Sequence, residues 1–346
     1  MTGTHEFHEP PLWATVRAMR AVVLAGGGGT RLRPLTNTTP KPMVEFMGQP
    51  YAVGLLRRLA AAGVDRLDLL VGRRSSDFAA LVDAGRDLGV DVSVLTEEVP
   101  LDTAGAARRL LRGSGEADVL VCNGDVLTDL DYATLVERHR RSGAVVTLAL
   151  TRVRDTSSFG VIECDRDGTV LRFVEKPPPG TISADTINAG TYVLDGAAFD
   201  PFPGDGPLSF EREVFPGLLT AGATLHGEPS TAHWQDLGTP ARYRDGHRAV
   251  LEDRCAWPIA DDLERQHGAV AVSTSADIGA GVKLEEPVTV GAEARLAEGV
   301  HLHDTVVLRG ARIGEGAIVR SAIIGPGAVV APGAQIGPEA IVVAGD

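Results

Sequence analysis

The amino-acid sequence predicts an α/β domain with a largely parallel sheet, followed by a parallel β-helix. Two observations lead to this prediction. From about residue 20 to 254, apolar runs alternate with helix-like segments, and such alternation is typical of βαβ units around a sheet that is covered on both faces. From residue 278 to 342, apolar residues recur at every sixth position, which is the period of neither an α-helix nor a simple strand.

The first part of the chain supplies the strands and helices of the sheet. Short apolar runs predict five strands: Ala21–Ala25, Leu67–Val71, Val90–Leu95, Val119–Cys122 and Val145–Leu150. Helix-like segments lie between them: Ala52–Ala62, Ser76–Leu88, Thr103–Leu111 and Tyr132–Arg141. Glycines stand where these helices should end, as the left-handed backbone of a helix C-cap requires: Gly63, Gly89, Gly113 and Gly143.

Beyond Thr151 the strands become shorter and alternate between apolar and polar residues. Asp167-Gly168 is a hairpin turn signal between the runs Val161–Cys164 and Leu171–Val174. Two further segments have the pattern of helices: Phe210–Leu219 and Pro240–Leu251.

The six-residue repeat occupies the last part of the chain in two registers. Its apolar positions are Ile278, Leu284, Val290, Leu296, Leu302 and Leu308, and then Ile318, Ile324, Val330, Ile336 and Val342. This period resembles the hexapeptide repeat of a left-handed parallel β-helix, in which one side chain of each short strand points into the core. The change of register predicts a bulged coil at 309–317. We therefore divide the chain into an N-terminal extension (1–19), the α/β domain (20–254), a linker (255–272) and the β-helix (273–346).

Composition excludes several classes of protein. A formal net charge of −13 argues against general nucleic-acid binding, which requires a basic face. No apolar run reaches the length of a membrane span, and residues 1–19 lack the apolar centre of a signal peptide. The three cysteines have no metal-ligand spacing, so we expect a protein of the reducing cytoplasm.

Four consecutive glycines, Gly26–Gly29, directly follow the first predicted strand. No Gly-Lys-Ser/Thr follows, as a Walker phosphate loop requires, and Arg31 stands where a dinucleotide fingerprint needs its third glycine. Glycines allow backbone N–H groups to approach a phosphate closely, and Arg31 adds a fixed positive charge. The segment therefore predicts a loop that binds an oligophosphate.

The use of lysine is unusual in this chain. Of 33 basic residues only Lys41, Lys176 and Lys283 are lysines, and the first two lie in the segments Pro40-Lys41-Pro42 and Glu175-Lys176-Pro177. A chain that otherwise uses arginine has kept a compact point charge at these two positions.

Together these motifs resemble the signature of the sugar-1-phosphate nucleotidylyltransferases, the nucleotide-sugar pyrophosphorylases. The segments that carry the resemblance are Leu24-Ala25-Gly26-Gly27-x-Gly29-Thr30-Arg31-Leu32-x-Pro34-Leu35-Thr36, Pro40-Lys41-Pro42-Met43, Asn123-Gly124-Asp125, Phe159-Gly160-Val161, Phe173-x-Glu175-Lys176-Pro177, Ile187-Asn188-Ala189-Gly190 and Trp234-x-Asp236-x-Gly238-Thr239-Pro240. With its repeat tail, the chain looks most like the mannose-1-phosphate guanylyltransferase-like branch. The resemblance implies a Rossmann-like mixed sheet of the GT-A-like kind.

The resemblance also implies a reaction and its residues. A sugar-1-phosphate oxygen would attack the α-phosphate of an NTP in line and release pyrophosphate. Asp125 and Asp236 would hold Mg²⁺, Arg31 the departing pyrophosphate, Lys41 the α-phosphate and Lys176 the sugar phosphate. The residues implied for nucleotide binding are Leu24, Ala25, Gly26, Gly27, Gly28, Gly29, Thr30, Arg31, Thr103, Ala104, Gly105, Asn123 and Gly124. Those implied for the sugar phosphate are Gly160, Glu175, Lys176, Asn188 and Gly190.

The segment Glu97–Ala106 resembles the base-recognition loop of guanylyltransferases, with Asp102 where these have glycine, and it favours GTP over ATP, UTP or dTTP. The acceptor stays open between a sugar 1-phosphate and a cyclitol 1-phosphate. A catalytically silent regulatory paralogue is the alternative function, although all five implied catalytic residues are present. We expect a homo-oligomer that assembles through the repeat tail, and we interpret His301 and His303 as surface residues of that tail.

Overall fold

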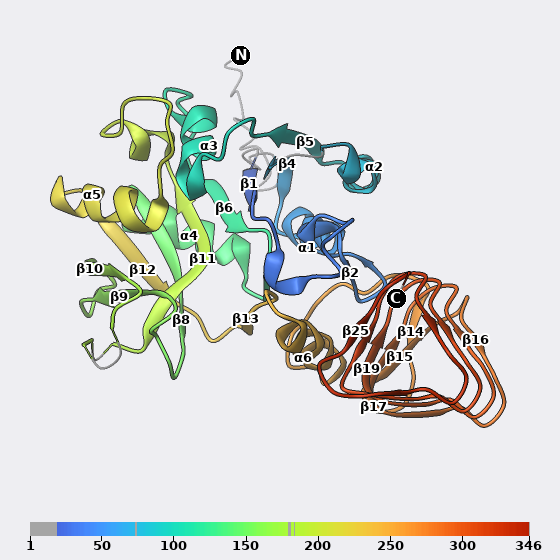
Figure 1. Ribbon diagram of the computed structural model, residues 1–346. Coiled ribbons are helices and arrows are strands. Elements are labelled where there is room, and N and C mark those ends of the chain that lie inside the picture. Colours follow the sequence, from blue (N-terminus) through green and yellow to red (C-terminus); the bar gives the residue numbers. More distant parts are fainter. Residues whose placement is uncertain (1–18, 73–74, 179–180, 183, 346) are drawn as a thin grey trace, which may run out of the picture.

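The computed structural model describes residues 19–72, 75–178, 181–182 and 184–345. The predicted N-terminal extension lies outside these residues except for Met19, which begins the first strand, β1 (Met19–Ala25). An α/β domain is followed by a C-terminal region of short strands, and helix α6 (Pro240–Leu251) lies where the two meet (Figure 1).

A mixed sheet of nine strands forms the centre of the α/β domain. Its order is β10-β9-β11-β6-β1-β4-β5, and in addition β8 pairs with β11 and β12 pairs with β8. β4, β1 and β6 run parallel, as predicted, whereas β11 is antiparallel to β6 and begins the hairpin-rich half. The bounds are β4 (Val64–Val71), β5 (Asp91–Thr96), β6 (Val119–Asn123), β8 (Val146–Arg152), β9 (Gly160–Cys164), β10 (Val170–Glu175), β11 (Thr186–Leu194) and β12 (Leu225–Pro229).

Helices cover both faces of this sheet. Along β1, Val23 packs into one hydrophobic cluster and its neighbour Val22 into the other, so the strand is buried on both sides. Gly89 and Gly143 end their helices with positive φ, as the glycine pattern predicts. The helices are α1 (Tyr51–Ala61), α2 (Ala79–Leu88), α3 (Asp102–Leu111), α4 (Tyr132–Ser142) and α5 (Phe215–Thr220), and a π-turn, η6 (Phe210–Val214), precedes α5. None of the described helices is both long and apolar enough to cross a membrane.

The segment predicted as a linker is packed against the α/β domain. Residues 255–272 contain β14 (Leu263–Arg265) and the start of β15 (Val270–Ser273). Trp257 is buried and stacks on Tyr51 with ring centroids 5.0 Å apart. Gly54 makes room for this indole, because a Cβ there would lie 2.7 Å from its nitrogen. This aromatic residue therefore anchors the stretch to the α/β domain.

Short parallel strands build the C-terminal region. Asp277 pairs with Arg295, Arg295 with Arg312 and Arg312 with Val329, so the chain returns to the same side once in each coil. Figure 1 shows these coils stacked on one another. The strands are β16 (Asp277–Ile278), β17 (Lys283–Val290), β18 (Arg295–Leu296), β19 (His301–Val307), β20 (Arg312–Ile313), β21 (Ile318–Arg320), β22 (Ile323–Ile324), β23 (Val329–Val330), β24 (Gln335–Ile336) and β25 (Ile341–Val342).

The predicted break in the repeat at 309–317 is wrong. Leu296 pairs with Ile313 and Leu302 with Val319, and all four side chains are buried, so the core register runs through this stretch without a bulge. The two short steps lie instead between Leu302 and Val307, and between Val319 and Ile324, since Val307 pairs with Ile324.

The corners of the two short steps have the same left-handed backbone as the corners of the longer steps. Asp304 and Ser321 each adopt a φ of 47°, and Glu293 and Gly310 in six-residue steps adopt 59° and 68°. Because of the short steps, Leu308 packs into the core of the α/β domain, and Ile318 is only half-buried. At two places the six-residue count took the apolar neighbour of the core position, Leu308 for Val307 and Ile318 for Val319, because both residues of each pair are apolar.

Candidate active site

The glycine-rich loop leaves β1 at the carboxyl edge of the sheet, where ligands of such sheets bind. Gly29 has a φ of 60°, and a Cβ there would lie 3.1 Å from Cβ of Lys41, so the fold itself requires this glycine. A Cβ on Gly27 would meet nothing within 4 Å, and on Gly26 or Gly28 the nearest atom would be 3.8 Å away. The first three glycines therefore expose backbone that no neighbouring residue crowds.

A hollow of about 190 Å³ lies over this loop. It gathers most of the predicted nucleotide-binding residues with the two expected cations, and it is lined by Leu24, Ala25, Gly27, Gly29, Thr30, Arg31, Lys41, Pro42, Gly124, Asp125 and Gly238. Thr36 fixes the loop, because its hydroxyl donates to the carbonyl oxygen of Gly29 at 2.7 Å.

The two predicted metal-ligating carboxylates lie side by side, although they are distant in the sequence. β13 (Trp234–Asp236) pairs antiparallel with β7 (Val126–Thr128), and this places Asp236 opposite Val126. The N–H of Leu237 donates to the carbonyl oxygen of Asp125 at 3.0 Å and holds the two segments together.

Basic side chains surround these carboxylates. Nζ of Lys41 lies 2.6 Å from Oδ2 of Asp125 and 3.7 Å from Oδ1 of Asp236. A guanidinium nitrogen of Arg31 lies 3.7 Å from the other oxygen of Asp236. Lys41 is nearly buried, with 11% of its side chain exposed, whereas Arg31 is 65% exposed and free to follow a ligand. Four of the five predicted catalytic residues therefore lie together: Arg31, Lys41, Asp125 and Asp236.

The carboxylate pair fits a divalent cation. Oδ1 of Asp236 is buried and has no hydrogen-bond partner among the described residues. Both carboxylates lie next to the same residue, Lys41. Hard oxygen donors of this kind suit Mg²⁺. Another group of possible ligands, Asp118, His139 and Asp195, lies at the opposite end of β6, and there Arg140 already pairs with Asp118 at 2.9 Å.

A second hollow of about 310 Å³ shares Arg31 and Asp125 with the first. All five predicted sugar-phosphate residues line it: Gly160, Glu175, Lys176, Asn188 and Gly190. Asn123 and Asp236 line it as well. The predicted nucleotide and acceptor sites therefore adjoin at the two aspartates.

The glycines of the second hollow are required by their own neighbours. Gly190 has a φ of 71°, and a Cβ there would lie 2.4 Å from the side-chain amide of Asn123. A Cβ on Gly160 would lie 2.6 Å from the ring of Phe173 and 3.0 Å from a carboxylate oxygen of Glu175. Either substitution would displace residues that line the hollow.

Glu175 and Lys176 form an ion pair at the rim, with Nζ 3.3 Å from Oε1, and Lys176 adopts a φ of 46°. Asn188 lies deeper and is engaged inside the chain. Its amide nitrogen donates to the hydroxyl of Tyr192 at 2.8 Å, and its oxygen accepts the N–H of Gly190 at 2.9 Å. Burial raises the pKa of the Tyr192 phenol well above its usual value, so this partner stays neutral.

The predicted base-binding segment is tied to a loop that the sequence analysis missed. The hydroxyl of Thr103 donates to Glu211 at 2.7 Å and accepts the N–H of Phe210 at 2.9 Å. The N–H groups of Ala104 and Gly105 both donate to the carbonyl oxygen of Leu208. Thr103 lines the second hollow, whereas Ala104 is fully buried against this loop.

Further polar residues line the second hollow from outside the motifs quoted above. Ser209, Glu211 and Arg212 line it from the start of η6, and Arg212 pairs with Asp102. The segment was interpreted only as a helix. A signal was present in the run Glu211-Arg212-Glu213, which places three charges at the start of an otherwise apolar helix. Asp102 itself has a φ of 61°, at the position where the resembled loop carries glycine.

Comparison with known proteins agrees with this geometry. Residues 20–253 match the family described as Nucleotidyl transferase, and residues 266–346 match the GMPPB C-terminal domain. The mannose-1-phosphate guanylyltransferase of Mycobacterium tuberculosis is 37% identical over 86% of this chain and 82% of its own length. Mannose-1-phosphate guanylyltransferase 1 of Arabidopsis thaliana is 33% identical over 87% of this chain and 84% of its own length.

A solved structure supports the same assignment. HddC from Yersinia pseudotuberculosis superimposes with a TM-score of 0.56 and 28% identity, over 66% of this chain and 97% of that protein. The same protein has also been crystallised in complex with GMP-PN. The chain therefore belongs to the nucleotidyl transferase family, in the branch that carries a GMPPB C-terminal domain and includes the mannose-1-phosphate guanylyltransferases.

Proposed function

We propose that this enzyme transfers GMP from GTP to a sugar 1-phosphate or a cyclitol 1-phosphate and releases pyrophosphate. One observation carries the proposal. The glycine-loop hollow and the acceptor hollow meet at Arg31 and Asp125, with Lys41 and Asp236 beside them. An in-line displacement needs two phosphates held end to end, and the junction of the two hollows is the point where they would meet.

The glycine loop would hold the triphosphate. Gly26, Gly27 and Gly28 leave room for close approach of phosphate oxygens to the backbone, since their Cβ positions are open. The exposed guanidinium of Arg31 would follow the departing pyrophosphate, and Lys41 would neutralise charge at the α-phosphate. Preorganised charges of this kind contribute about 3 kcal/mol each to the transition state.

Asp125 and Asp236 are the residues that would hold Mg²⁺. Oδ1 of Asp236 is buried and accepts no hydrogen bond from the described residues, and it lies beside Asp125, which supports this role. A bound Mg²⁺ would polarise the phosphate oxygens and neutralise part of their charge. The chain's own contribution is to fix the two carboxylates through the β13–β7 pair and to keep Lys41 between them.

The acceptor would bind in the second hollow, with its phosphate toward Lys176 and its hydroxyls toward Glu175. Asn188 and Gly190 form the floor, because their mutual hydrogen bond and the Tyr192 contact fix this part of β11. Glu211 adds a further acceptor for hydroxyl groups. Sugars and cyclitols share these hydroxyl and phosphate handles, so the class of acceptor is broader than mannose alone.

GTP is the favoured nucleotide. The segment from Glu97 to Ala106 resembles that of guanylyltransferases, and similar proteins are named for guanylyl transfer. Glu97 supports this segment, because its carboxylate accepts the N–H of Leu101 at 3.1 Å. Thr103, Ala104 and Gly105 would then shape the wall of the base site by holding the loop at Leu208 and Phe210 in place.

Pyrophosphate release in Mg²⁺, with each of GTP, ATP, UTP and dTTP against a panel of sugar and cyclitol 1-phosphates, tests the proposal. We expect turnover with GTP and with at least one acceptor. Binding of GTP without turnover on any acceptor would instead identify a regulatory paralogue. A preference for another nucleotide would overturn the assignment of GTP.

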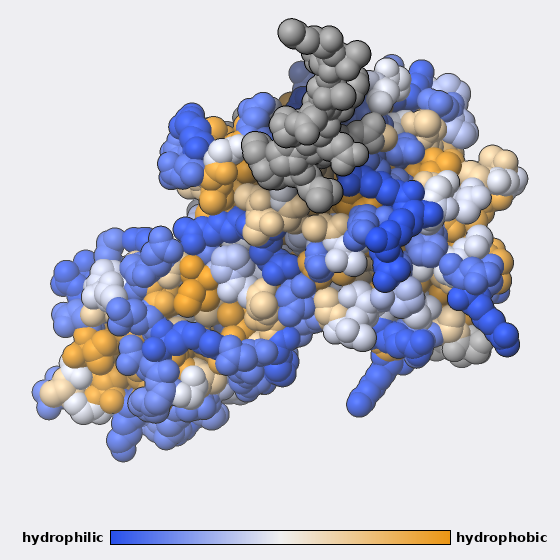
Figure 2. Space-filling view, turned by 180° about the vertical axis from the view of Figure 1, so that it is seen from behind, coloured by the Kyte–Doolittle hydropathy of each residue, from blue (hydrophilic) through white to orange (hydrophobic). Residues whose placement is uncertain are grey.

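We propose that the C-terminal coils form a left-handed β-helix and that this domain joins copies of the chain. The parallel pairing of each strand with the next coil supports the β-helix. Ile278 and Val329 on one of its sheets are 39% and 64% exposed, and Figure 2 shows apolar surface on this region at the lower left. Sedimentation of the full chain at micromolar concentration would show a homo-oligomer, and a monomer at every concentration would contradict this.

We also propose that the enzyme works in the reducing cytoplasm. Cys122, Cys164 and Cys255 are all free thiols, and Cys122 is buried, which raises its pKa to about 12 and keeps it unreactive. Fractionation of the source cells would place the activity in the soluble fraction if this is correct.

A further inference from the structure

We propose that the C-terminal strand domain sets the position of the Asp236 carboxylate through α6, with Arg242 as the positioning residue. This inference rests on the proposed function, because it treats Asp236 as a group that acts in the reaction. Arg242, Arg248 and Asp304, which carry the effect, lie outside the sequence motifs of the site.

The first step is the contact between Arg242 and Asp236. A guanidinium nitrogen of Arg242 donates to Oδ2 of Asp236 at 2.8 Å, whereas Arg31 and Lys41 each lie 3.7 Å from this carboxylate. Asp236 is 16% exposed, and its Oδ1 has no hydrogen-bond partner among the described residues. The bond to Oδ2 therefore fixes the rotation of the carboxylate and turns Oδ1 toward Lys41.

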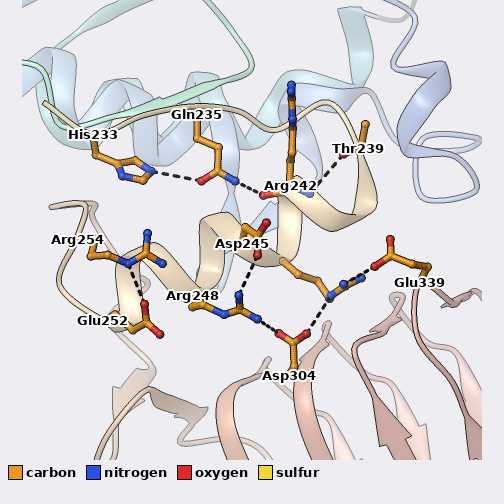
Figure 3. A network of polar contacts seen from close by, with 11 residues as sticks. His233, Gln235, Thr239, Arg242, Asp245, Arg248, Glu252, Arg254, Asp304 and Glu339 are labelled. Carbon is orange, nitrogen blue, oxygen red and sulfur yellow. Dashed lines mark hydrogen bonds and ion pairs between the residues drawn. The ribbon is translucent and has the colours of Figure 1, made fainter. Parts of the chain in front are cut away.

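The second step is the attachment of Arg242 to both neighbouring elements. Its N–H donates to the N-cap hydroxyl of Thr239 at 3.3 Å, and its carbonyl oxygen accepts from the side chain of Gln235 at 2.6 Å. Gln235 lies in β13, next to Asp236. Figure 3 shows His233, Gln235, Arg242 and Thr239 linked in one chain of contacts at the start of α6. The first turn of the helix and the strand that carries Asp236 therefore move as one unit.

The third step is the anchor of α6 on the C-terminal strands. Arg248 donates to Oδ1 of Asp304 at 2.8 Å, and Arg244 lies 3.7 Å from its Oδ2. Arg244 also pairs with Glu339 at 2.6 Å, and His247 is hydrogen-bonded to Thr289 at 3.1 Å. Arg244 and Asp304 are only 8% and 10% exposed, and Figure 3 shows Asp304 reaching up from the strands to the helix.

Charge and burial give this anchor its role. Ion pairs removed from water add little net stability, but they are strongly destabilising when one partner is lost, and they can fix how two elements are arranged. Here one carboxylate holds two arginines that lie one turn apart on α6. Because the first turn of the same helix carries Arg242, which holds Asp236, a shift of α6 on the strands displaces the carboxylate.

Three variants test the proposal: Asp304→Asn removes the anchor, Arg242→Gln removes the bond to Asp236, and Arg254→Gln is the matched control. Arg254 lies just beyond α6 and pairs with Glu252 on the surface at 2.8 Å (Figure 3). R254Q therefore removes one positive charge, as R242Q does, without touching the anchor. The readouts are kcat and KM for GTP, the Mg²⁺ concentration at half-maximal rate, and binding of Mn²⁺ to the enzyme followed by electron paramagnetic resonance.

We expect D304N and R242Q each to weaken Mn²⁺ binding and raise the half-maximal Mg²⁺ concentration about tenfold, as loss of a group behind a metal ligand does. The KM for GTP should stay within about twofold, because neither Asp304 nor Arg242 lines the hollow over the glycine loop. The double variant should lose no more than R242Q alone, since both changes act on one carboxylate. R254Q should match the wild type, and Arg242→Lys should recover part of the loss.

Wild-type Mn²⁺ binding in D304N, equal losses in R254Q, or losses that add in the double variant would each overturn the proposal. If D304N does not fold, R242Q decides the question together with R242K, because Arg242 is 43% exposed and lies outside the anchor. Failure of the proposed function is a separate result: the wild-type enzyme would then show no turnover with any nucleotide and acceptor, whereas failure of this inference leaves an active wild type and active variants.

Discussion

Nζ of Lys41 lies 2.6 Å from a carboxylate oxygen of Asp125, so the lysine expected at the α-phosphate and the aspartate expected at Mg²⁺ neutralise one another. A lysine that is nearly buried would be costly without such a partner. The pair also places both charges at the junction of the two hollows. A small movement of the Lys41 side chain would therefore let its ammonium group leave the Asp125 carboxylate and contact a phosphate instead.

Asp125→Asn should lower kcat by about 10²–10³-fold, because it removes a charged oxygen from the reacting centre and leaves Lys41 without its partner. Asp131→Asn is the matched control. Asp131 caps α4 by accepting the N–H of Thr134 at 3.0 Å, and asparagine caps a helix equally well. Steady-state pyrophosphate release with saturating GTP measures the effect. Full activity of D125N would remove Asp125 from the site.

Glycine-to-alanine substitutions in the loop can distinguish a glycine that leaves room for a ligand from one that the fold requires. Gly27→Ala should leave the free energy of unfolding within about 0.5 kcal/mol of the wild type, because its Cβ position is open. Its KM for GTP should rise about tenfold if the triphosphate approaches this backbone, which corresponds to about 1.4 kcal/mol of lost binding. Unchanged KM would place the triphosphate elsewhere.

Gly29→Ala should behave differently. The φ of 60° costs a residue with a Cβ about 1–2 kcal/mol, and the new Cβ would press on Lys41 at 3.1 Å. We therefore expect a lower free energy of unfolding together with a lower kcat. Thermal unfolding and turnover of the two variants, measured in parallel, decide whether the difference between these glycines is real.

Asp102 carries a left-handed backbone at the start of α3, where glycine is the least strained residue. Asp102→Ala should be less stable than Asp102→Gly by about 1 kcal/mol, because both lose the pair with Arg212 but only alanine keeps the Cβ penalty. Urea unfolding of the two variants measures this difference directly. Equal stabilities would mean that the φ of 61° costs nothing at this position.

The sequence predicted the parts of the fold that depend on local chemistry. Strands such as Val119–Asn123 and helix ends such as Gly89 follow from apolar runs and backbone freedom, and both were found where expected. It also predicted the residues that surround Asp125, because the motif residues themselves specify the site. These predictions needed no knowledge of distant contacts.

Long-range packing explains what the sequence did not reveal. Glu211 and Arg212 line the second hollow because Thr103 and Asp102 hold their loop from another element. The packing of Trp257 in the stretch predicted as a linker could not be foreseen, because its partner Tyr51 lies far away in the chain. The short steps were missed because Val307-Leu308 and Ile318-Val319 are both apolar pairs, and only the pairing of the coils shows which member points into the core.

The junction between α6 and the C-terminal strands should be sensitive to acid through His247. This residue is buried against Phe46 and Tyr243 and bonded to Thr289, and its burial lowers its pKa to about 3. In the unfolded chain the pKa returns to about 6.5, so between these values the unfolded state binds more protons. Stability from the neutral imidazole is therefore present above pH 6.5 and is lost as the pH falls toward 3.

The expected loss is about 2 kcal/mol of unfolding free energy between pH 7 and pH 5. Urea unfolding at the two pH values measures it, with His247→Gln as the comparison, because glutamine offers Thr289 a hydrogen bond but does not titrate. His226, a partly buried histidine that pairs with Glu228 at 3.3 Å, supplies the control variant His226→Gln. We expect H247Q to lose most of the pH dependence and H226Q to retain it. If H247Q were as acid-sensitive as the wild type, the acid-labile group would lie outside this junction.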